Sequence, residues 1–286
     1  MIVCKTPAEM QAACRELRNS APGNHSLGLV PTMGALHAGH LSLVSTAKAG
    51  CDAVAASIFV NPTQFAPGED FEAYPRDFEG DCRKLESAGV HILFAPCASD
   101  MYPPGNTTFV DPGDIGTRLD GASRPGHFRG VATIVARLFH IVAPDRAYFG
   151  QKDAAQIAVL RQMVRDLNFP VHLAVCPIVR EPDGLAMSSR NRYLSKDERS
   201  SALILSRALH TAEHLAHTSE TCAEALRSAM LAVLATNPTV RLDYAAIVDP
   251  DTLLPVADTS HGALLAVAAF IGSTRLIDNL SIAPRG

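Results

Sequence analysis

The fold is decided by the stretch Leu27-Gly28-Leu29-Val30-Pro31-Thr32-Met33-Gly34-Ala35-Leu36-His37-Ala38-Gly39-His40-Leu41. Its apolar beginning predicts a buried strand, and the residues from Ala38 onward predict a helix after a turn of small residues. The two histidines, three residues apart, then lie on one face of the first helical turns. A helix N-terminus has unpaired N–H groups and partial positive charge, which suit a phosphate. The alternative is a tight turn with two ordinary histidines, so the interpretation depends on what else converges there.

Strands and helices alternate on both sides of this stretch as far as about residue 177. Thr6-Pro7-Ala8-Glu9 predicts the start of a first helix, with a capping box and a proline at the first helical position. The expected strands cover residues 27–30, 53–60, 90–94, 146–149 and 171–175, and the later helices cover 39–49, 78–88, 131–142 and 153–167. This alternation predicts an α/β fold with a Rossmann-like parallel sheet and ligands at the carboxyl ends of its strands.

The pattern changes after the segment 179–192. Ser195-Lys196-Asp197-Glu198 and Thr221-Cys222-Ala223-Glu224 are two further capping boxes, each expected to open a helix. Strands are then expected near residues 241–248, 263–271 and 275–280. Two helices followed by hairpin-like strands predict a smaller α+β domain with an antiparallel sheet. We therefore expect one domain over residues 1–177 and a second over 178–286.

Composition excludes several classes of protein. The formal charge of −4 argues against a nucleic-acid surface, which needs a basic patch. The longest apolar run, residues 263–271, is too short to span a membrane. Seven cysteines without a C-x-x-C pair favour reduced thiols rather than a disulfide framework or a zinc site. Lys5 and Glu9 interrupt any secretory signal pattern, so we expect a cytoplasmic protein.

Polar clusters follow two of the expected strands. Gln64, in Asn61-Pro62-Thr63-Gln64-Phe65, offers one acceptor and two donors to a small hydroxy acid. Taken alone, however, this motif favours an ordinary polar loop residue after an Asn-Pro turn. Lys152, in Phe149-Gly150-Gln151-Lys152-Asp153, supplies a charge for phosphate, and Asp153 either accepts from ribose hydroxyls or caps its own helix. Gln156 follows one turn later.

Two further clusters lie in loops. Met187-Ser188-Ser189-Arg190-Asn191-Arg192 places two hydroxyls and a guanidinium between the expected domains, where a loop could close over a triphosphate. Such a triplet in an ordinary surface loop has no role. Arg124-Pro125-Gly126-His127-Phe128-Arg129-Gly130 is either an anion-binding gate or a polar loop that opens the next helix, and we favour the gate. His140 lies on an apolar helix and is expected to be a core histidine.

Taken in order, these motifs resemble the pantoate–β-alanine ligase family, and the resemblance runs through the last expected strand. The turn around His37 and His40 resembles that family's version of the HIGH nucleotide motif, and Met187-Ser188-Ser189-Arg190-Asn191 resembles the mobile KMSKS loop. The motifs at 61–65, 126–133 and 149–153 also match the family. The resemblance implies that ATP and pantoate form pantoyl-adenylate and pyrophosphate, and that β-alanine then gives pantothenate and AMP.

The resemblance also implies roles for individual residues. The ATP site would comprise Met33, Gly34, Ala35, Leu36, His37, Ala38, Gly39, His40, Gly150, Gln151, Lys152, Asp153, Val179, Met187, Ser188, Ser189 and Arg190. His37, His40, Lys152 and Arg190 would be catalytic, with His40 the proton donor. Gln64 and Gln156 would bind pantoate, and Gln64 would also lie near β-alanine. The family usually has a glutamine where this chain has Ala155, and the first domain would bind nucleotide and pantoate while the second acts as a lid.

The expected chemistry needs positioning and charge neutralisation rather than a protein nucleophile. Mg²⁺ is expected to bridge the phosphates, with no dedicated cluster of protein ligands. A homodimer is implied by the resemblance alone. The rival interpretations are a nucleotidylyltransferase that stops after AMP transfer, a tRNA synthetase fragment and a non-catalytic nucleotide-binding module. Gln64 and Gln156 argue against the first, the absence of a basic surface against the second, and the set of His, Lys and Arg side chains against the third.

Overall fold

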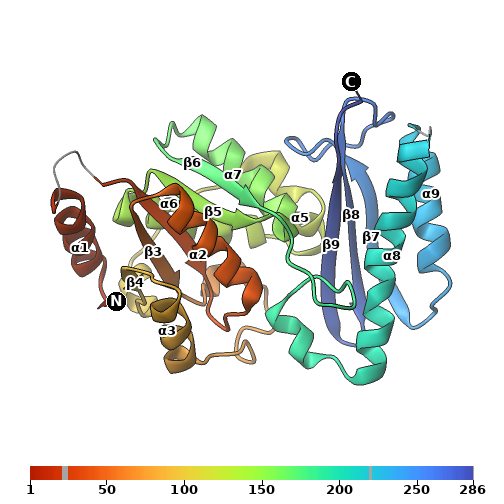
Figure 1. Cartoon of the computed structure of the whole chain (residues 1–286). Helices are drawn as coiled ribbons and strands as arrows, with labels where there is room; N and C mark the ends of the chain where they lie inside the picture. The colour runs from red at the N-terminus through yellow and green to blue at the C-terminus, as the bar shows by residue number, and fades with distance from the viewer. Residues whose placement is uncertain (21–24, 219–220, 286) are drawn as a thin grey trace.

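Two β-sheets organise the chain in the computed structural model, which describes residues 1–20, 25–218 and 221–285 (Figure 1). The first sheet has six strands and the second has three. This arrangement confirms the predicted fold class, a Rossmann-like parallel sheet followed by a smaller α+β unit. Within the described ranges, no helix combines the length and the hydrophobicity that crossing a bilayer requires.

The first sheet has the strand order β1-β4-β3-β2-β5-β6, and all neighbouring strands are parallel. Its strands are β1 (Ile2–Cys4), β2 (Leu27–Thr32), β3 (Ala53–Ile58), β4 (Ile92–Phe94), β5 (Arg146–Gly150) and β6 (His172–Cys176). After β2 the chain builds outward through β3 and β4, and then returns to the other side of β2 as β5 and β6. The order therefore reverses between β2 and β5, where doubly wound sheets bind their ligands.

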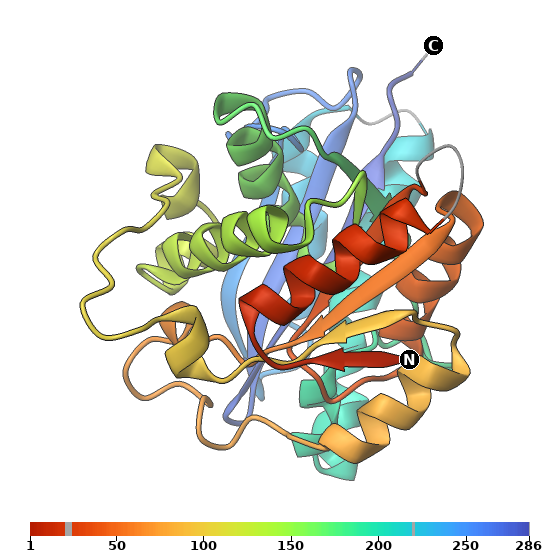
Figure 2. The ribbon, with the colours of Figure 1, turned by 90° about the vertical axis from the view of Figure 1, so that its left-hand side faces the viewer.

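Helices cover both faces of this sheet because its strands alternate their side chains. Leu27 and Leu29 of β2 pack with α1 (Pro7–Asn19), α6 (His127–Val142) and α7 (Ala154–Asp166). Val30 faces the opposite way. It packs with α2 (Ala38–Gly50) and α3 (Phe78–Ser87). Figure 2 shows α1 and α6 side by side on the first of these faces.

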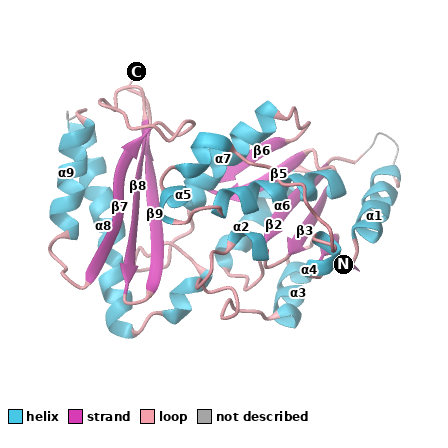
Figure 3. Cartoon of the chain, turned by 180° about the vertical axis from the view of Figure 1, so that it is seen from behind, coloured by secondary structure: helices cyan, strands magenta, loops and turns pink. Residues whose placement is uncertain are grey.

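The second unit is a layer of two helices on an antiparallel sheet. Its elements are α8 (Lys196–Thr218), α9 (Ala223–Leu234), β7 (Val240–Val248), β8 (Ala263–Ile271) and β9 (Thr274–Ile282), with the strand order β7-β8-β9. Leu265 and Val267 of β8 pack with the helices, on the side away from the first sheet (Figure 3). Leu264 and Ala266 belong instead to the core of the first unit. The two units therefore share a packed interface, and the division at residue 177 stays a prediction.

Several local predictions can be compared directly with the structure. The capping boxes at Thr6 and Ser195 are confirmed, since each hydroxyl accepts the N–H three residues on and the glutamate there accepts in return. The box at Thr221 is wrong: the Thr221 side chain bonds to Asp258, and α9 begins after Cys222. The short edge strand β1 was not predicted, because three residues are too few to show a period.

Two further differences concern α6. The helix begins at His127, one turn before the predicted residue 131, because Gly126 takes a left-handed conformation (φ 83°) that ends the preceding loop there. The expectation of a core position for His140 is wrong. Its side chain is exposed and lies against Phe169, with ring centroids 5.2 Å apart. A single polar residue on an apolar helix can equally mark the helix's solvent edge.

Candidate active site

The turn after β2 reverses the chain within four residues. The Thr32 hydroxyl donates to the Ser57 carbonyl (2.6 Å) and accepts from Gly34 N–H (3.1 Å), which ties the end of β2 to β3. Gly34 (φ 81°) and Ala35 (φ 51°) both have left-handed backbone conformations. The chain then enters α2 with His37 as N-cap. This turn lies at the carboxyl end of β2, as the sequence predicted, and β2 is the strand at which the order reverses.

The backbone donors of this turn are largely occupied by the protein itself. Ala35 N–H and Leu36 N–H donate to the two oxygens of the buried Asp81 carboxylate (2.7 and 2.9 Å). Gly39 N–H donates to Nδ1 of His37 (3.2 Å). The expectation that free N–H groups at this helix end hold phosphate is therefore corrected for these three donors. A ligand at this turn would therefore be bound mainly by side chains.

The two imidazoles form a close pair, tilted by 40° to each other, whose tautomers are set by the backbone. Their ring centroids are 4.1 Å apart. Nδ1 of His37 accepts from Gly39 N–H and Nδ1 of His40 accepts from His37 N–H (3.4 Å), so each neutral ring carries its hydrogen on Nε2. Burial lowers the pKa of His37 to about 4 and that of His40 to about 3. The neighbouring His37 ring lowers the pKa of His40 further, and the positive charge of Lys152 lowers the pKa of both rings. At neutral pH the pair therefore presents uncharged N–H donors.

A second cluster lies at the end of β3 and on η1 (Pro62–Gln64). The Asn61 side-chain amide donates to Gln64 Oε1 and to the Gly130 carbonyl, both at 3.1 Å. Gln64 Nε2 contacts Met33 Sδ at 3.1 Å. The pocket beside Gln64 also contains apolar side chains of α6, among them Val131, Ile134, Val135 and Leu138. It combines an amide with a hydrocarbon wall, which suits a small branched hydroxy acid.

The predicted gate at 124–130 closes one side of that pocket. Arg124 forms a two-point ion pair with Glu69 (2.7 and 2.6 Å) and also donates to Nε2 of His127 (3.0 Å). His127 donates from Nδ1 to the Gln64 carbonyl (2.8 Å). Burial and the Arg124 charge lower the pKa of His127 to about 4, so this ring is neutral as well. The gate thus holds the backbone of Gln64 in place.

The third cluster follows β5. Lys152 lies 3.3 Å from Asp153, and both line the pocket next to His37 and His40. Gln151 turns the other way, toward β9, where its Nε2 donates to Asn279 Oδ1 (3.2 Å). Asn279 in turn donates to the Gln151 and Lys152 carbonyls (3.0 and 2.8 Å). A residue of the second sheet therefore fixes the backbone that carries Lys152.

The fourth cluster comes from the connection between β6 and α8. Arg190 forms two hydrogen bonds of 2.8 Å with the Asp70 carboxylate, and Ser189 Oγ lies 3.1 Å from the Tyr74 hydroxyl. Burial opposes the charge on Asp70, but the hydrogen bonds and charge of Arg190 hold the pKa of that carboxyl below its usual value. Arg180 ties the same connection to Asp278 of β9 (2.7 Å). The 186–193 tract is thus docked against Asp70 and Tyr74, in the segment that follows Gln64.

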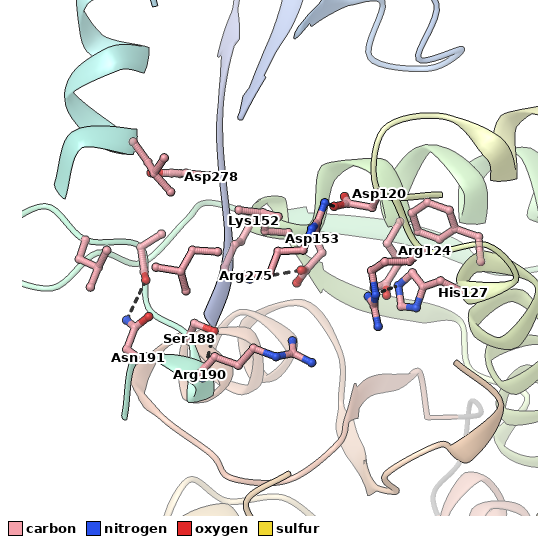
Figure 4. A pocket seen from close by; sticks show the side chains of 17 residues that line it. Asp120, Arg124, His127, Lys152, Asp153, Ser188, Arg190, Asn191, Arg275 and Asp278 are labelled. Carbon is pink, nitrogen blue, oxygen red and sulfur yellow. Dashed lines mark hydrogen bonds and ion pairs between the residues drawn. The ribbon is translucent and has the colours of Figure 1, made fainter. Parts of the chain in front are cut away.

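The structure brings most of the predicted ATP-site residues together in one pocket. Its lining includes Met33, His37, Gly39, His40, Gly150, Lys152, Asp153, Val179, Met187, Ser188, Ser189 and Arg190. Gln156 lines it as well and also faces the pocket beside Gln64. Figure 4 shows the adjoining part of the cleft, where Lys152, Asp153, Ser188 and Arg190 surround a common space with Arg124 and His127 on its far side.

Five residues that were predicted for the ATP site lie outside this pocket. Gly34 lines a separate hollow behind the turn, while Ala35 and Leu36 are buried. Ala38 is exposed at the start of α2, and Gln151 turns toward β9. Ala155, where the family usually has glutamine, packs in the core of the first unit rather than in the cleft. The substitution therefore leaves the lining of the pocket to Gln156.

A family model for pantoate-beta-alanine ligase matches residues 2–281. The chain belongs to the pantoate-beta-alanine ligase family. The pantothenate synthetase of Acidobacterium capsulatum is 60% identical over 284 residues, which is 96% of this chain and 95% of that protein. The pantothenate synthetase of Koribacter versatilis is 56% identical over 286 residues, 100% of this chain and 97% of its own length.

Solved structures of pantoate-beta-alanine ligases have the same fold. The crystal structure of the Thermus thermophilus pantothenate synthetase superimposes with a TM-score of 0.92 at 49% identity, covering 99% of this chain and 100% of that one. The Francisella tularensis pantoate-beta-alanine ligase, complexed with beta-gamma ATP and beta-alanine, superimposes with a TM-score of 0.79 at 35% identity. The match covers 98% of this chain and 97% of that one. The likeness extends over both units.

Sequence reasoning missed the acidic partners of the site in this ligase. Glu69 and Asp70 bind the two arginines, and Asp81 binds the turn, yet each lies 45 or more residues from its partner. No local pattern marks such residues, because their partners come from other elements. Across the residues that the structure covers, no group of three or more His, Cys, Asp or Glu side chains could hold a metal ion.

Proposed function

We propose that this chain joins pantoate to β-alanine at the expense of ATP, forming pantothenate, AMP and pyrophosphate through a pantoyl-adenylate. The observation that carries the proposal is the meeting of His37, His40, Lys152 and Ser188–Arg190 around one pocket, which shares lining residues with the pocket beside Gln64. One pocket suits a triphosphate and the other suits a small hydroxy acid. Family membership makes the chain a ligase of this type.

In the first step a pantoate carboxylate oxygen attacks the α-phosphorus of ATP, and the bond to the β-phosphate oxygen breaks to release pyrophosphate. Gln64 and Gln156 would hold pantoate, with the apolar wall of α6 against its methyl groups. Negative charge builds on the phosphate oxygens as the bond breaks. Nε2–H of His37 and His40, the Lys152 ammonium and the Arg190 guanidinium would stabilise that charge.

In the second step the β-alanine amine attacks the acyl carbon of the adenylate. The new C–N bond forms as the C–O bond to phosphate breaks, AMP leaves with the bonding electrons, and the nitrogen gives up one proton to solvent water. Because His40 is neutral at pH 7, its Nε2–H serves as a hydrogen-bond donor to the phosphate rather than as a strong acid. The docked 186–193 tract would keep water from the reactive adenylate.

Mg²⁺ would fit this cleft as a phosphate-bound ion. Asp153 lines the pocket beside Lys152, and a single carboxylate with phosphate oxygens and water matches the ligands that Mg²⁺ prefers. When bound, the ion would neutralise charge on the triphosphate. The resemblance also supports a homodimer. A cytoplasmic location agrees with the reduced thiols expected of seven cysteines that include no C-x-x-C pair.

The test is AMP formation by the purified chain with ATP and Mg²⁺ and with pantoate, β-alanine, both or neither. We expect ATP–pyrophosphate exchange to require pantoate, and AMP release to rise steeply when β-alanine is added. AMP release independent of the amine would favour the nucleotidylyltransferase alternative. No exchange with pantoate would overturn the proposal and favour a binding module.

A further inference from the structure

A buried carboxylate lies directly beneath the turn that carries the two histidines. Asp81 comes from the first turns of α3, and its side chain is 1% exposed. Its two oxygens accept from consecutive backbone donors, Oδ2 from Ala35 N–H (2.7 Å) and Oδ1 from Leu36 N–H (2.9 Å). A carboxylate is the side chain best suited to accept two adjacent N–H groups at once.

Lys84 completes this arrangement from the same helix. One turn beyond Asp81, its ammonium donates to the Leu36 carbonyl (2.9 Å) and lies 3.3 Å from Asp81 Oδ1. Asp81 and Lys84 thus bind three successive peptide units of the turn, from the Gly34–Ala35 peptide to the Leu36–His37 peptide. The next residue is His37, so these contacts end where the imidazole pair begins.

The turn needs such support because its backbone is unfavourable. Ala35 has φ 51°, a left-handed conformation that costs free energy for a residue with a Cβ atom. The preceding Gly34 has φ 81°, and a Cβ there would lie 3.1 Å from Asp81 Oδ2. The charged hydrogen bonds to Asp81 compensate for this strain.

Asp81 acts from outside the nucleotide pocket. Together with Gly34 and Phe78 it lines a separate hollow behind the turn. His37 and His40 line the nucleotide pocket on the other side. Asp81 therefore does not line the nucleotide pocket, and it supports that pocket through the backbone of the turn.

We propose that Asp81, assisted by Lys84, is a positioning residue that holds the left-handed turn at Gly34–Ala35 so that His37 and His40 point at the triphosphate. The proposal rests on the function proposed above. It predicts that loosening the turn lowers transition-state stabilisation at the phosphates, although no ligand contact is removed.

The test compares two carboxylates that accept backbone N–H groups at opposite ends of β2. Asp81→Asn leaves an acceptor for only one of the two N–H groups and turns its amide toward the other. The matched control is Asp145→Asn, because Asp145 accepts from Leu27 N–H (2.7 Å) at the start of the strand, away from the site. Hydrogen exchange at individual amides is measured by NMR, and kcat/KM for ATP is measured by pyrophosphate exchange.

We expect Asp81→Asn to accelerate hydrogen exchange at Ala35 and Leu36 and to lower kcat/KM at least about tenfold. The control Asp145→Asn should accelerate hydrogen exchange at Leu27 and keep kcat/KM within about twofold of the wild type. Unchanged exchange at Ala35 and Leu36 would overturn the proposal, and so would faster exchange with kcat/KM equal to that of the control. An inactive wild-type chain would instead refute the proposed function, since the exchange measurement does not depend on activity.

A second variant covers the case in which Asp81→Asn does not fold. Lys84→Met removes the bond to the Leu36 carbonyl from a side chain that is 40% exposed, so the fold should tolerate it. We expect faster exchange at Leu36 and a kcat/KM about three- to tenfold lower. A double variant with Asp81→Asn should lose less than the product of the two single effects, because both residues hold the same turn. A wild-type kcat/KM in Lys84→Met would overturn the assistance assigned to Lys84.

Discussion

Replacement of His40 tests how the imidazole pair acts on the phosphates. In the structure its Nδ1 accepts from His37 N–H and its Nε2–H is left to face the pocket. Loss of one donor to a developing oxyanion lowers a rate by about 10²–10³, or about 3–4 kcal/mol. Loss of the capping contact to His37 N–H costs about 1 kcal/mol of folding free energy. His40→Ala should therefore lower adenylation at least about a hundredfold with only a small loss of stability.

Glutamine and asparagine separate the two roles of the ring. A glutamine amide places a donor near the position of Nε2, whereas an asparagine amide reaches only the position of Nδ1. We expect His40→Gln to recover about tenfold of the activity lost in His40→Ala, and His40→Asn to recover stability but little rate. The assays are single-turnover formation of pantoyl-adenylate and urea unfolding.

The pH profile provides an independent check on the same residue. Because burial and the neighbouring ring lower the pKa of His40 to about 3, its imidazole stays neutral throughout pH 6–8. The pH profiles of the wild type and of His40→Gln should therefore have the same shape near pH 6.5. A titration there that is present in the wild type and absent from His40→Gln is not expected. Such a titration, or equal rates in the alanine and glutamine variants, would refute the role of His40 as a neutral donor.

Three further predictions follow from individual contacts. Lys152→Ala should lower adenylation at least about a hundredfold, since it removes a charge facing the phosphates, and near-normal single-turnover adenylate formation would contradict this role. Gly130→Ala would place a Cβ 2.3 Å from the Thr63 carbonyl oxygen. It should therefore lower the free energy of unfolding by about 1–3 kcal/mol and raise KM for pantoate, and unchanged urea unfolding and KM would show that the contact relaxes freely. Stability should also fall as the pH drops from about 6.5 toward 4, because His127, with a folded pKa of about 4, binds its proton more readily in the unfolded chain. Urea unfolding at pH 7 and 5 measures this, and His127→Gln should lose less stability than the wild type.

Much of the fold could be predicted because its signals are local. The capping boxes at Thr6 and Ser195 depend on residues three positions apart, and both are confirmed. The strands of the first sheet are short apolar runs between helices, and five of its six were predicted within a few residues. The capping box at Thr221 failed because a third element, the loop at Asp258, supplied a competing partner for the hydroxyl.

The site was harder to predict because its charges are balanced across the fold. The sequence indicated Arg190 and Arg124 as anion-binding candidates. It did not indicate that adjacent residues, Asp70 and Glu69, hold the two arginines. Nor did it indicate that the N–H groups of Ala35 and Leu36, apparent phosphate donors, are taken by Asp81.

The sequence by itself determined the kinds of element, their order and the chemical groups that follow each strand, because hydrophobic period, caps and turn residues act over a few positions. Only the tertiary structure decided which donors remain available to a ligand. The hydrogen-bonding state of Ala35 N–H, of Leu36 N–H and of the Arg190 guanidinium depends on partners that folding brings from other elements. A buried polar group needs such a partner, and its identity is a property of the assembled fold.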